Sequence, residues 1–429
     1  MQITAAAPPA QTAGQLAPLP LKLRTCAAPG ARASPGTVRD ALCAAAMQAD
    51  AEDAFFVADL GEVQRQFAQW VQLLPRVQPF FAVKCNPDPL VVKLLARLGA
   101  GFDCASRAEL QQALDEGVAP HNIIYAHPCK PASHVRFARD NSVAMMTFDN
   151  ADELAKMRAL HPGARAVLRI LADDSGALCQ LGRKFGAAPE STLHLLQTAQ
   201  RLGVDVIGVS FHVGSGSQSA DAFADAVLRA RRVFDQAASL GMRLTLLDVG
   251  GGFPGRGDQS GLVFADVAAA LRAALDQHFP PESAAHVRII AEPGRYFVAS
   301  AFSLAVNIVA RRVEPRADGP AFMYYVNDGV YGSFNCIVFD HQHPVPRVLT
   351  CRGRLVDAPL ATAGYESSVW GPTCDSIDCI VPEGRLPELH VGDWLVFDAM
   401  GAYTICAASR FNGFKISDIV YVDTERALL

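Results

Sequence analysis

The feature that most constrains the fold is a regular alternation, between about residues 79 and 298, of short apolar runs with amphipathic stretches. Each apolar run has five to nine residues and is apolar on both faces, as the strands of a buried parallel sheet must be. Eight such runs separated by helical patterns are typical of an α/β fold of the (β/α)₈ TIM-barrel type. The same alternation also fits an open, doubly wound parallel sheet, which is the alternative to the barrel. The runs occupy residues 79–84, 101–105, 122–127, 143–149, 165–171, 205–213, 243–249 and 287–292.

The pattern changes after residue 298, where helical periodicity gives way to β-branched and aromatic runs. This change predicts a C-terminal all-β domain, of β-sandwich type, over residues 299–429. The apolar run at 54–58 precedes the barrel and could add a strand to either part. We assign residues 36–58 to the β-domain, residues 59–298 to the barrel, and the Ala/Pro-rich residues 1–35 to a flexible tail.

Composition excludes several classes of protein. The net charge of −5 argues against nucleic acid as the main partner, because binding phosphates needs a basic face. The uncharged stretch at 296–310 is shorter than the roughly 20 residues that span a membrane. The uncharged first 21 residues contain four prolines and no basic start, unlike a signal peptide. Eleven scattered cysteines without metal-ligand spacing indicate a reducing, cytoplasmic location and no metal site.

Polar and glycine-rich residues gather where the predicted strands end, which is where barrel proteins carry out chemistry. Each has an ordinary structural explanation when taken alone, such as a lysine that reaches solvent or a histidine satisfied in the core. Together they indicate a site. The candidates are Lys84, Asp103, Glu109, Arg169, His212, Ser215, the glycines at 250–252, Glu292 and Arg295.

The chemistry of these residues suggests one cofactor. Lys84 lies in an apolar run, where desolvation lowers the pKa of an amine and makes it a nucleophile toward a carbonyl. The glycines, with Ser215 and Arg295, could bind a phosphate. Glu292 could pair with a pyridinium nitrogen or an arginine, and His212 could stack on a ring. A covalent lysine, a phosphate cradle, an acid for a ring nitrogen and a stacking imidazole indicate pyridoxal 5′-phosphate.

The chain also resembles a known family along most of its length, from about residue 55 to 421. It is similar to the fold III pyridoxal-phosphate amino-acid decarboxylases, and within them to the eukaryotic type of ornithine decarboxylase. Nine motifs in order carry the resemblance: PFFAVKCN (79–86), GFDCAS (101–106), RKFG (183–186), SFHVGSG (210–216), DVGGGFPG (248–255), EPGRYFV (292–298), NDGVYGSFN (327–335), WGPTCDSID (370–378) and GAYT (401–404).

The resemblance implies a barrel followed by a β-sandwich-like domain, and a head-to-tail homodimer whose two active sites form between the subunits. It implies that Lys84 carries the cofactor, that Glu292 pairs with the pyridine nitrogen and that His212 stacks on the ring. The further cofactor contacts that it implies are Ser215, Gly252, Arg295 and Tyr403 around the phosphate, with Asp103, Glu109 and Arg169 lining the cofactor.

The resemblance also implies substrate contacts. Cys374, from the partner subunit, would control reprotonation of the substrate's α-carbon, although a lone cysteine is more often a small buried hydrophobe. Asp375 and Asp340 would meet the terminal ammonium, and Tyr331 and Phe411 would shape the pocket. The neighbour of Asp340 is Phe339, where animal members commonly have tyrosine, which removes a hydroxyl near the substrate. The segment 172–182 would be a mobile surface loop.

The expected reaction is therefore decarboxylation of L-ornithine to putrescine, a step of polyamine biosynthesis. Lysine, or both amino acids, is the main alternative, because one methylene is weakly discriminated. Diaminopimelate is disfavoured by the Cys374–Asp375 pair, and arginine by the lack of larger inserted domains. A non-catalytic relative that sequesters a regulator would have lost cofactor residues that are present here. A racemase is disfavoured by the β-domain.

Overall fold

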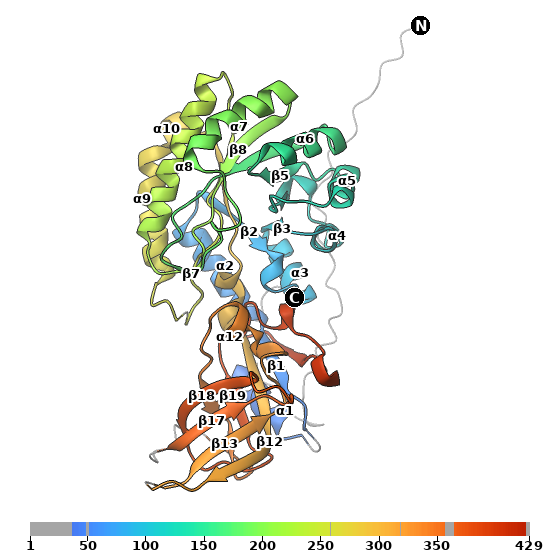
Figure 1. The fold of residues 1–429 in the computed structure, drawn as a ribbon, viewed down its shortest axis with the longest axis vertical. Helices are drawn as coiled ribbons and strands as arrows, with labels where there is room; N and C mark the ends of the chain where they lie inside the picture. The colour runs from blue at the N-terminus through green and yellow to red at the C-terminus, as the bar shows by residue number, and fades with distance from the viewer. Residues whose placement is uncertain (1–36, 49–50, 258, 318, 357–363, 426–429) are drawn as a thin grey trace.

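In the computed structural model two bodies follow each other along the long axis of the molecule, with the barrel above and the β-domain below in Figure 1. The structure describes residues 37–48, 51–257, 259–317, 319–356 and 364–425. The tail predicted for residues 1–35 lies outside these ranges. Within them, no helix is both long and apolar enough to cross a membrane.

The predicted barrel is confirmed: eight parallel strands close in the order β10-β11-β2-β3-β4-β5-β6-β8. Its interior is a separate apolar cluster that includes Phe80, Ile124 and Leu246, one from each of three strands, so the centre is filled by side chains. The strands are β2 (Val77–Ala82), β3 (Gly101–Cys104), β4 (Ile123–Tyr125), β5 (Met145–Phe148), β6 (Arg165–Arg169), β8 (Asp205–Ser210), β10 (Leu246–Asp248) and β11 (Arg288–Ala291).

Helices cover the outside of the barrel and pack their apolar stripes against the outer face of the strands. Local sequence sets their ends: α3 begins after Asp88, whose side chain accepts from the amides of Leu90 and Val91, and it ends at Gly99 with φ +91°. The helices are α2 (Leu60–Leu73), α3 (Pro89–Leu98), α4 (Arg107–Asp115), α5 (Ala132–Asp140), α6 (Ala151–Leu160), α7 (Pro189–Leu202), α8 (Asp221–Ser239), α9 (Phe264–His278), α10 (Pro281–Ala284) and α11 (Arg295–Val298).

The C-terminal region is the expected all-β domain, and one long strand organises it. The first half of β12 (Phe302–Glu314) pairs with β1 and β19, while its second half, beyond an irregularity between Ile308 and Ala310, pairs with β13. The other strands of this sheet are β1 (Phe55–Asp59), β13 (Ala321–Val326), β14 (Pro346–Val348), β17 (Tyr365–Trp370), β18 (Cys379–Leu386), β19 (Trp394–Phe397) and β20 (Asp418–Val422), and β15 (Thr350–Cys351) pairs separately with β16 (Arg354–Leu355).

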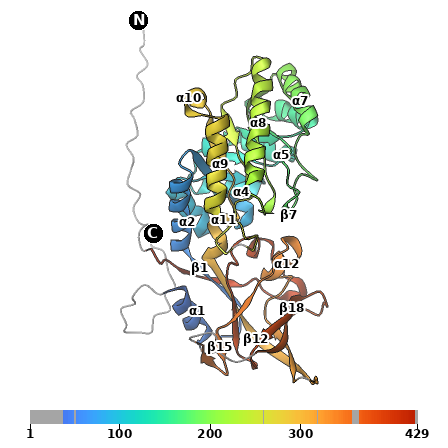
Figure 2. The same ribbon diagram turned by 90° about the vertical axis from the view of Figure 1, so that its left-hand side faces the viewer.

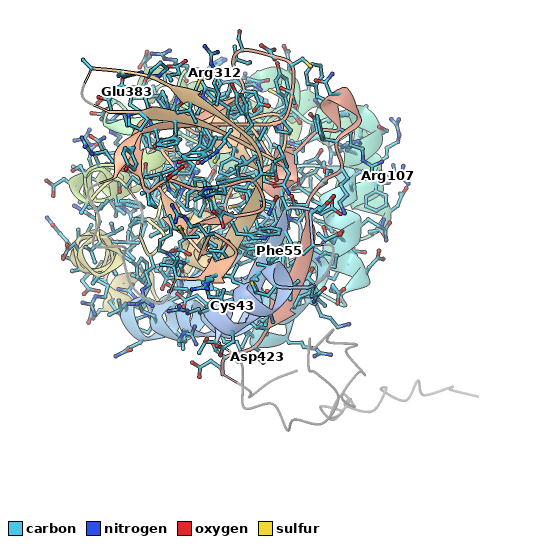
Figure 3. The ribbon with its side chains drawn as sticks, turned by 90° about the horizontal axis from the view of Figure 1, so that it is seen from below. Cys43, Phe55, Arg107, Arg312, Glu383 and Asp423 are labelled. Atoms are coloured by element: carbon cyan, nitrogen blue, oxygen red, sulfur yellow. The ribbon has the colours of Figure 1, made fainter. Side chains whose placement is uncertain are left out.

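The strand β1, which precedes the barrel, is a central member of the β-domain sheet. It lies between β12, to which it is antiparallel, and β20, to which it is parallel. The helix α1 (Val38–Ala46) covers this part of the sheet, and Leu42 packs with Phe55 and Trp394 in a small apolar cluster. Figure 2 shows α1 beside the β-domain, and Figure 3 shows Cys43 and Phe55 on the same underside of the molecule.

The two bodies meet at the carboxyl ends of the barrel strands. The Asn86 side chain donates to the carbonyl of Gly401 at 2.8 Å, and the amide of Tyr403 donates to the carbonyl of Cys85 at 3.0 Å. The short helix α12 (Cys336–Phe339) lies at the same junction in Figure 1. Residues of the β-domain thereby reach the barrel mouth, which is where the candidate site forms.

Candidate active site

Lys84 lies just beyond its strand rather than within it. The sequence predicts a strand up to residue 84, but β2 ends at Ala82 and residues Val83–Cys85 form a 3₁₀ turn. The turn closes when the amide of Asn86 donates to the carbonyl of Val83 at 3.1 Å, and Pro87, which has no N–H, follows it. The Lys84 side chain is 38% exposed and lines a pocket at the barrel mouth.

The amine of Lys84 forms an ion pair with Asp103 on the neighbouring strand. Burial alone would lower the pKa of this amine, but the carboxylates of Asp103 and Glu292 outweigh burial, and the pKa is raised. The prediction of a lowered pKa from an apolar surrounding is therefore wrong for this structure, because the surrounding strand ends carry acids. Asp103 is 1% exposed, and its second oxygen, Oδ1, accepts no hydrogen bond.

Glu109 lies on the first turn of α4, behind Asp103. Its carboxylate accepts from the amide of Ala105 at 2.6 Å, and Ser106 caps the helix. Burial raises the pKa of Glu109, partly offset by this amide and by Lys84. Glu109 thus contributes to the acidic side of the pocket without lining it.

The glycines after β10 make room for close backbone approach. A Cβ on Gly250 would lie 1.8 Å from the carbonyl oxygen of Phe211, and a Cβ on Gly252, where φ is +102°, would lie 2.6 Å from the carbonyl oxygen of Gly214. Any larger residue at either position would clash with the chain after β8. Gly252 lines the pocket beside Gly216.

Three polar side chains face these glycines. The Arg295 guanidinium donates to the hydroxyl of Ser215 at 3.2 Å and lies 5.3 Å from the ring centre of Tyr403. Arg295 is only 8% exposed, and all three residues line the pocket. A guanidinium, two hydroxyls and open backbone form the donor set that a phosphate requires.

Asp340, which we expected to contact the terminal ammonium of the substrate, is paired with an arginine of the barrel instead. Its carboxylate pairs with Arg295 at 2.5 Å and is 5% exposed, because α12 ends at the preceding residue and turns Asp340 toward the barrel. Asp340 therefore lies on the phosphate side of the pocket. Its second oxygen is 3.8 Å from the thiol of Cys179.

That thiol belongs to the segment predicted to be a mobile loop. Residues Ala177–Cys179 form the short strand β7, which pairs antiparallel with β9 (Ser215–Ser217). The segment therefore lies against the strand that carries Ser215.

His212 is partly buried and lines the pocket. Its Nδ1 accepts from the amide of Gly214 at 3.0 Å, which leaves Nε2 to carry the proton of a neutral ring. Burial, with the positive charges of Arg169 and Lys84, lowers the pKa of His212 well below its usual value. A neutral imidazole in this position suits stacking on a flat ring.

Glu292 follows β11 and meets an acid that the sequence analysis missed. Asp248, at the end of β10, is fully buried, and its carboxyl lies close enough to that of Glu292 for each to shift the pKa of the other. Burial raises the pKa of both carboxyls, to about 7 for Asp248. Glu292 was singled out because it is an acid at the end of an apolar run. Asp248 is also an acid near the end of such a run, so the same pattern could have identified it.

Arg169, the last residue of β6, does not line the pocket. Its guanidinium lies 5.3 Å from the ring centre of Phe185, in the RKFG motif. It acts on the pocket through charge, since it lowers the pKa values of His212 and Asp248.

Four predicted residues form a second group on the β-domain, here called the β-domain cluster: Tyr331, Cys374, Asp375 and Phe411. The hydroxyl of Tyr331 donates to Asp375, and the rings of Tyr331 and Phe411 stack with centres 4.3 Å apart. Cys374 and Phe411 are exposed. None of the four lines the pocket of their own chain.

Eight predicted residues do line that pocket, here called the cofactor pocket: Lys84, Asp103, His212, Ser215, Gly252, Glu292, Arg295 and Tyr403. Among the described residues, no group of histidine, cysteine and acidic side chains could hold a metal ion. The unpartnered Asp103 oxygen, the glycine cradle and the donor set beside it fit a phosphorylated aromatic aldehyde better than any metal.

Fold and pocket together define a barrel protein whose lining, which includes a lysine, suits a phosphorylated ring cofactor. Comparison with known proteins identifies the family. Residues 60–299 match the model described as "Pyridoxal-dependent decarboxylase, pyridoxal binding domain". The chain belongs to the pyridoxal-dependent decarboxylases.

Three relatives illustrate the range of the family. Ornithine decarboxylase of Schizosaccharomyces pombe is 54% identical over 375 residues, which are 87% of this chain and 84% of the relative. Antizyme inhibitor 2 of Xenopus laevis is also 54% identical, over 87% of this chain and 82% of its own length. The crystal structure of the Paramecium bursaria Chlorella virus arginine decarboxylase is 37% identical, with a TM-score of 0.80 over 86% of this chain and 96% of that one.

Proposed function

We propose that the protein catalyses the decarboxylation of L-ornithine to putrescine with pyridoxal 5′-phosphate. The observation that carries the proposal is the gathering of eight predicted cofactor residues around one pocket in a chain about half identical to ornithine decarboxylases. Pyridoxal phosphate, when bound, supplies the electron sink that accepts the electron pair left by departing carbon dioxide.

The chain's own residues hold that cofactor and set its charge. Lys84 would bind it covalently through its amine, and Asp103 would hold this amine in place. Ser215, Arg295 and Tyr403 would bind its phosphate. At the opposite end of the pocket Glu292 would face the ring nitrogen, and His212, neutral at physiological pH, would cover the ring face without adding a competing positive charge.

We infer that a second copy of the chain completes the site. The β-domain cluster carries the side chains that the chemistry still needs, but it lies outside the cofactor pocket of its own chain. Its exposed Phe411, together with Phe339 at 68% exposure and Ile377 at 58%, supplies apolar surface for a subunit contact. In the homodimer Cys374 would protonate the α-carbon after decarboxylation, and Asp375 would bind the substrate's terminal ammonium.

Charge at Asp375 supports its role toward a cationic substrate. The Tyr331 hydroxyl and the amide of Ile377 hold the pKa of Asp375 below its usual value, so it is anionic at neutral pH. The charge of Asp340 is already paired with the Arg295 guanidinium through Oδ2. We therefore assign the main ammonium contact to Asp375.

Lysine remains the alternative substrate, because it differs from ornithine by one methylene, which is worth about 1–3 kcal/mol in a binding site. The lack of large inserted domains does not exclude arginine, because this chain covers 96% of the length of a solved arginine decarboxylase. Arginine is therefore tested on equal terms.

The test is carbon dioxide release measured side by side with ornithine, lysine, arginine and diaminopimelate. We expect the highest kcat/KM with ornithine and formation of putrescine. A preference for lysine or arginine would overturn the proposed substrate while leaving the cofactor chemistry intact.

A non-catalytic role is the second candidate, because antizyme inhibitor 2 is as similar to this chain as the yeast enzyme is. The complete cofactor pocket argues for the enzyme. Purified protein that is yellow and turns over any of the four amino acids excludes the non-catalytic role, whereas colourless, inactive protein would establish it. We place the protein in the cytoplasm, where its ten described cysteines, all free thiols, stay reduced.

A further inference from the structure

Behind the cofactor pocket lies a second carboxyl for which the reaction described above has no use. Asp248 ends β10 and Glu292 follows β11, and the two chain segments run side by side: the amide of Glu292 donates to the carbonyl of Gly250 at 2.6 Å. Glu292 lines the pocket, whereas Asp248 is fully buried and does not. Asp248 therefore touches Glu292 from the side away from the cofactor.

The hydrogen bonding of Asp248 is incomplete unless the pair holds a proton. Its Oδ1 accepts from the amide of Gly250 at 2.9 Å, but its Oδ2, also buried, meets no amide, amine or hydroxyl donor. The group within hydrogen-bonding reach is the Glu292 carboxyl, and two carboxylates cannot bond each other without a shared proton.

The charges around the pair favour that proton. The groups that act on the two carboxyls are the acid Asp103 and the cations Lys84 and Arg169. Asp103 is already bonded to Lys84, and His212, whose Nε2 lies near Gly251, is held neutral. Burial raises the pKa of both carboxyls; Asp248 raises the pKa of Glu292 further, whereas Glu292 lowers that of Asp248, so the free pair carries its proton on Glu292. Two fully ionised carboxylates are disfavoured here.

We propose that Asp248 is a positioning residue that takes the proton of the pair when the cofactor binds and returns it as a hydrogen bond to Glu292. Glu292 then presents a carboxylate to the ring nitrogen of the cofactor. If the proton starts on Glu292, it moves from a Glu292 oxygen to Oδ2 of Asp248, one O–H bond breaking as the other forms, with no net change of charge. The proposal rests on the cofactor site of the proposed function, but not on the identity of the substrate.

Two substitutions separate the parts of this proposal. Asp248→Asn copies protonated aspartate: its oxygen can accept from Gly250, and its amide can donate to Glu292 without ever titrating. Asp248→Ala removes the donor and leaves Glu292 without its buried partner. The matched control is Ser210→Ala, because Ser210 is level with Asp248 on the next strand, is buried, and has a hydroxyl without a partner.

The measurement is the affinity of the full-length protein for pyridoxal phosphate. The cofactor is removed from the holoenzyme and added back from pH 6 to 9, and its binding is followed by absorbance. At pH 7 we expect Asp248→Ala to bind the cofactor at least about tenfold more weakly, and Asp248→Asn to stay within about threefold of wild type. Between pH 6 and 9 the wild-type affinity should change as Asp248 titrates, whereas that of Asp248→Asn should change less. Ser210→Ala should follow wild type.

A double-mutant cycle with Glu292→Gln tests whether Asp248 acts through Glu292. In the Glu292→Gln background, the loss caused by Asp248→Ala should largely disappear. An equal loss in both backgrounds, or a wild-type alkaline profile in Asp248→Asn, would overturn the proposal. Because affinity and absorbance are read without turnover, a wrong assignment of ornithine as substrate would leave these results unchanged.

Discussion

The cofactor pocket and the β-domain cluster, which we propose carry the two halves of one reaction, are built differently. In the cofactor pocket Asp103, Glu292 and Arg295 are each less than one-tenth exposed and are held by partners within the same chain. In the β-domain cluster Cys374 is exposed, and Asp375 is held only by local contacts from Tyr331 and its own turn.

In the proposed homodimer, this difference would separate what a single chain does from what needs the second copy. Buried, mutually bonded charges preorganise a cofactor site before any substrate arrives. Exposed groups interact strongly with a substrate only when another surface covers them and excludes water. Cofactor binding should therefore depend on the barrel residues, and turnover on both groups.

The largest effect is expected from Lys84→Ala. Without the amine the cofactor has no covalent anchor, so activity should fall by at least about three orders of magnitude and the yellow colour should be lost. Absorbance and carbon dioxide release measure the two losses. Turnover retained at the wild-type level would show that the barrel pocket is not the site of chemistry.

Mixed subunits test the dependence on a second copy directly. Neither Lys84→Ala nor Cys374→Ala should have much activity alone, but an equal mixture, allowed to exchange subunits, should recover about a quarter of wild-type activity, because half of the dimers then hold one intact site. Lys84→Ala mixed with itself is the control. If the mixture stays inactive although mixed dimers form, Cys374 works within its own chain.

A smaller effect is expected from Asp375→Ala, which removes a charged partner of the substrate but touches nothing in the cofactor pocket. KM for ornithine should rise about ten- to hundredfold while cofactor affinity stays unchanged. Arg316→Ala, whose ion pair with Glu366 lies elsewhere on the β-domain surface, should leave both constants unchanged. A loss of cofactor affinity in Asp375→Ala would contradict the separation of the two groups.

The smallest effect concerns stability. Folding raises the pKa of Asp248 from 3.8 to about 7, so its contribution favours the folded chain most below pH 4 and is lost as the pH rises through 7. Between pH 6 and 8, Tm of the wild type should therefore fall by a few degrees more than that of Asp248→Asn. Asp375→Asn should show the wild-type slope, because the lowered pKa of Asp375 leaves it ionised throughout this range.

Much of the fold could be predicted because buried parallel strands and amphipathic helices leave strong patterns. The helices Pro89–Leu98 and Phe264–His278, for example, carry their buried apolar residues at helical spacing. The helix α5 leaves a weak pattern, because Ala132–Asp140 carries only two fully buried residues, Val135 and Ala138. The strands β17 and β18 also leave a weak pattern, because polar residues and glycine interrupt their apolar residues.

The members of the cofactor pocket could be predicted, but their electrostatics could not. The identity of Lys84 follows from its place at a strand end, whereas the direction of its pKa depends on Asp103 and Glu292, which neighbouring strands bring to it. In the same way, the pairing of Asp340 with Arg295 joins residues 45 positions apart across the domain junction. Such contacts depend on the packing of separate elements, which local patterns do not encode.

The position of β1 has a consequence for how the chain is made. Phe55 of β1 pairs with Ala305 of β12, about 250 residues later, so the whole barrel is inserted between two adjacent strands of one sheet. At roughly 5–20 residues per second, β1 leaves the ribosome at least ~12 s before its partner exists. The barrel can fold in that interval, whereas the fully buried strand FFVAD must wait. During synthesis this apolar strand is an aggregation hazard until β12 has been made.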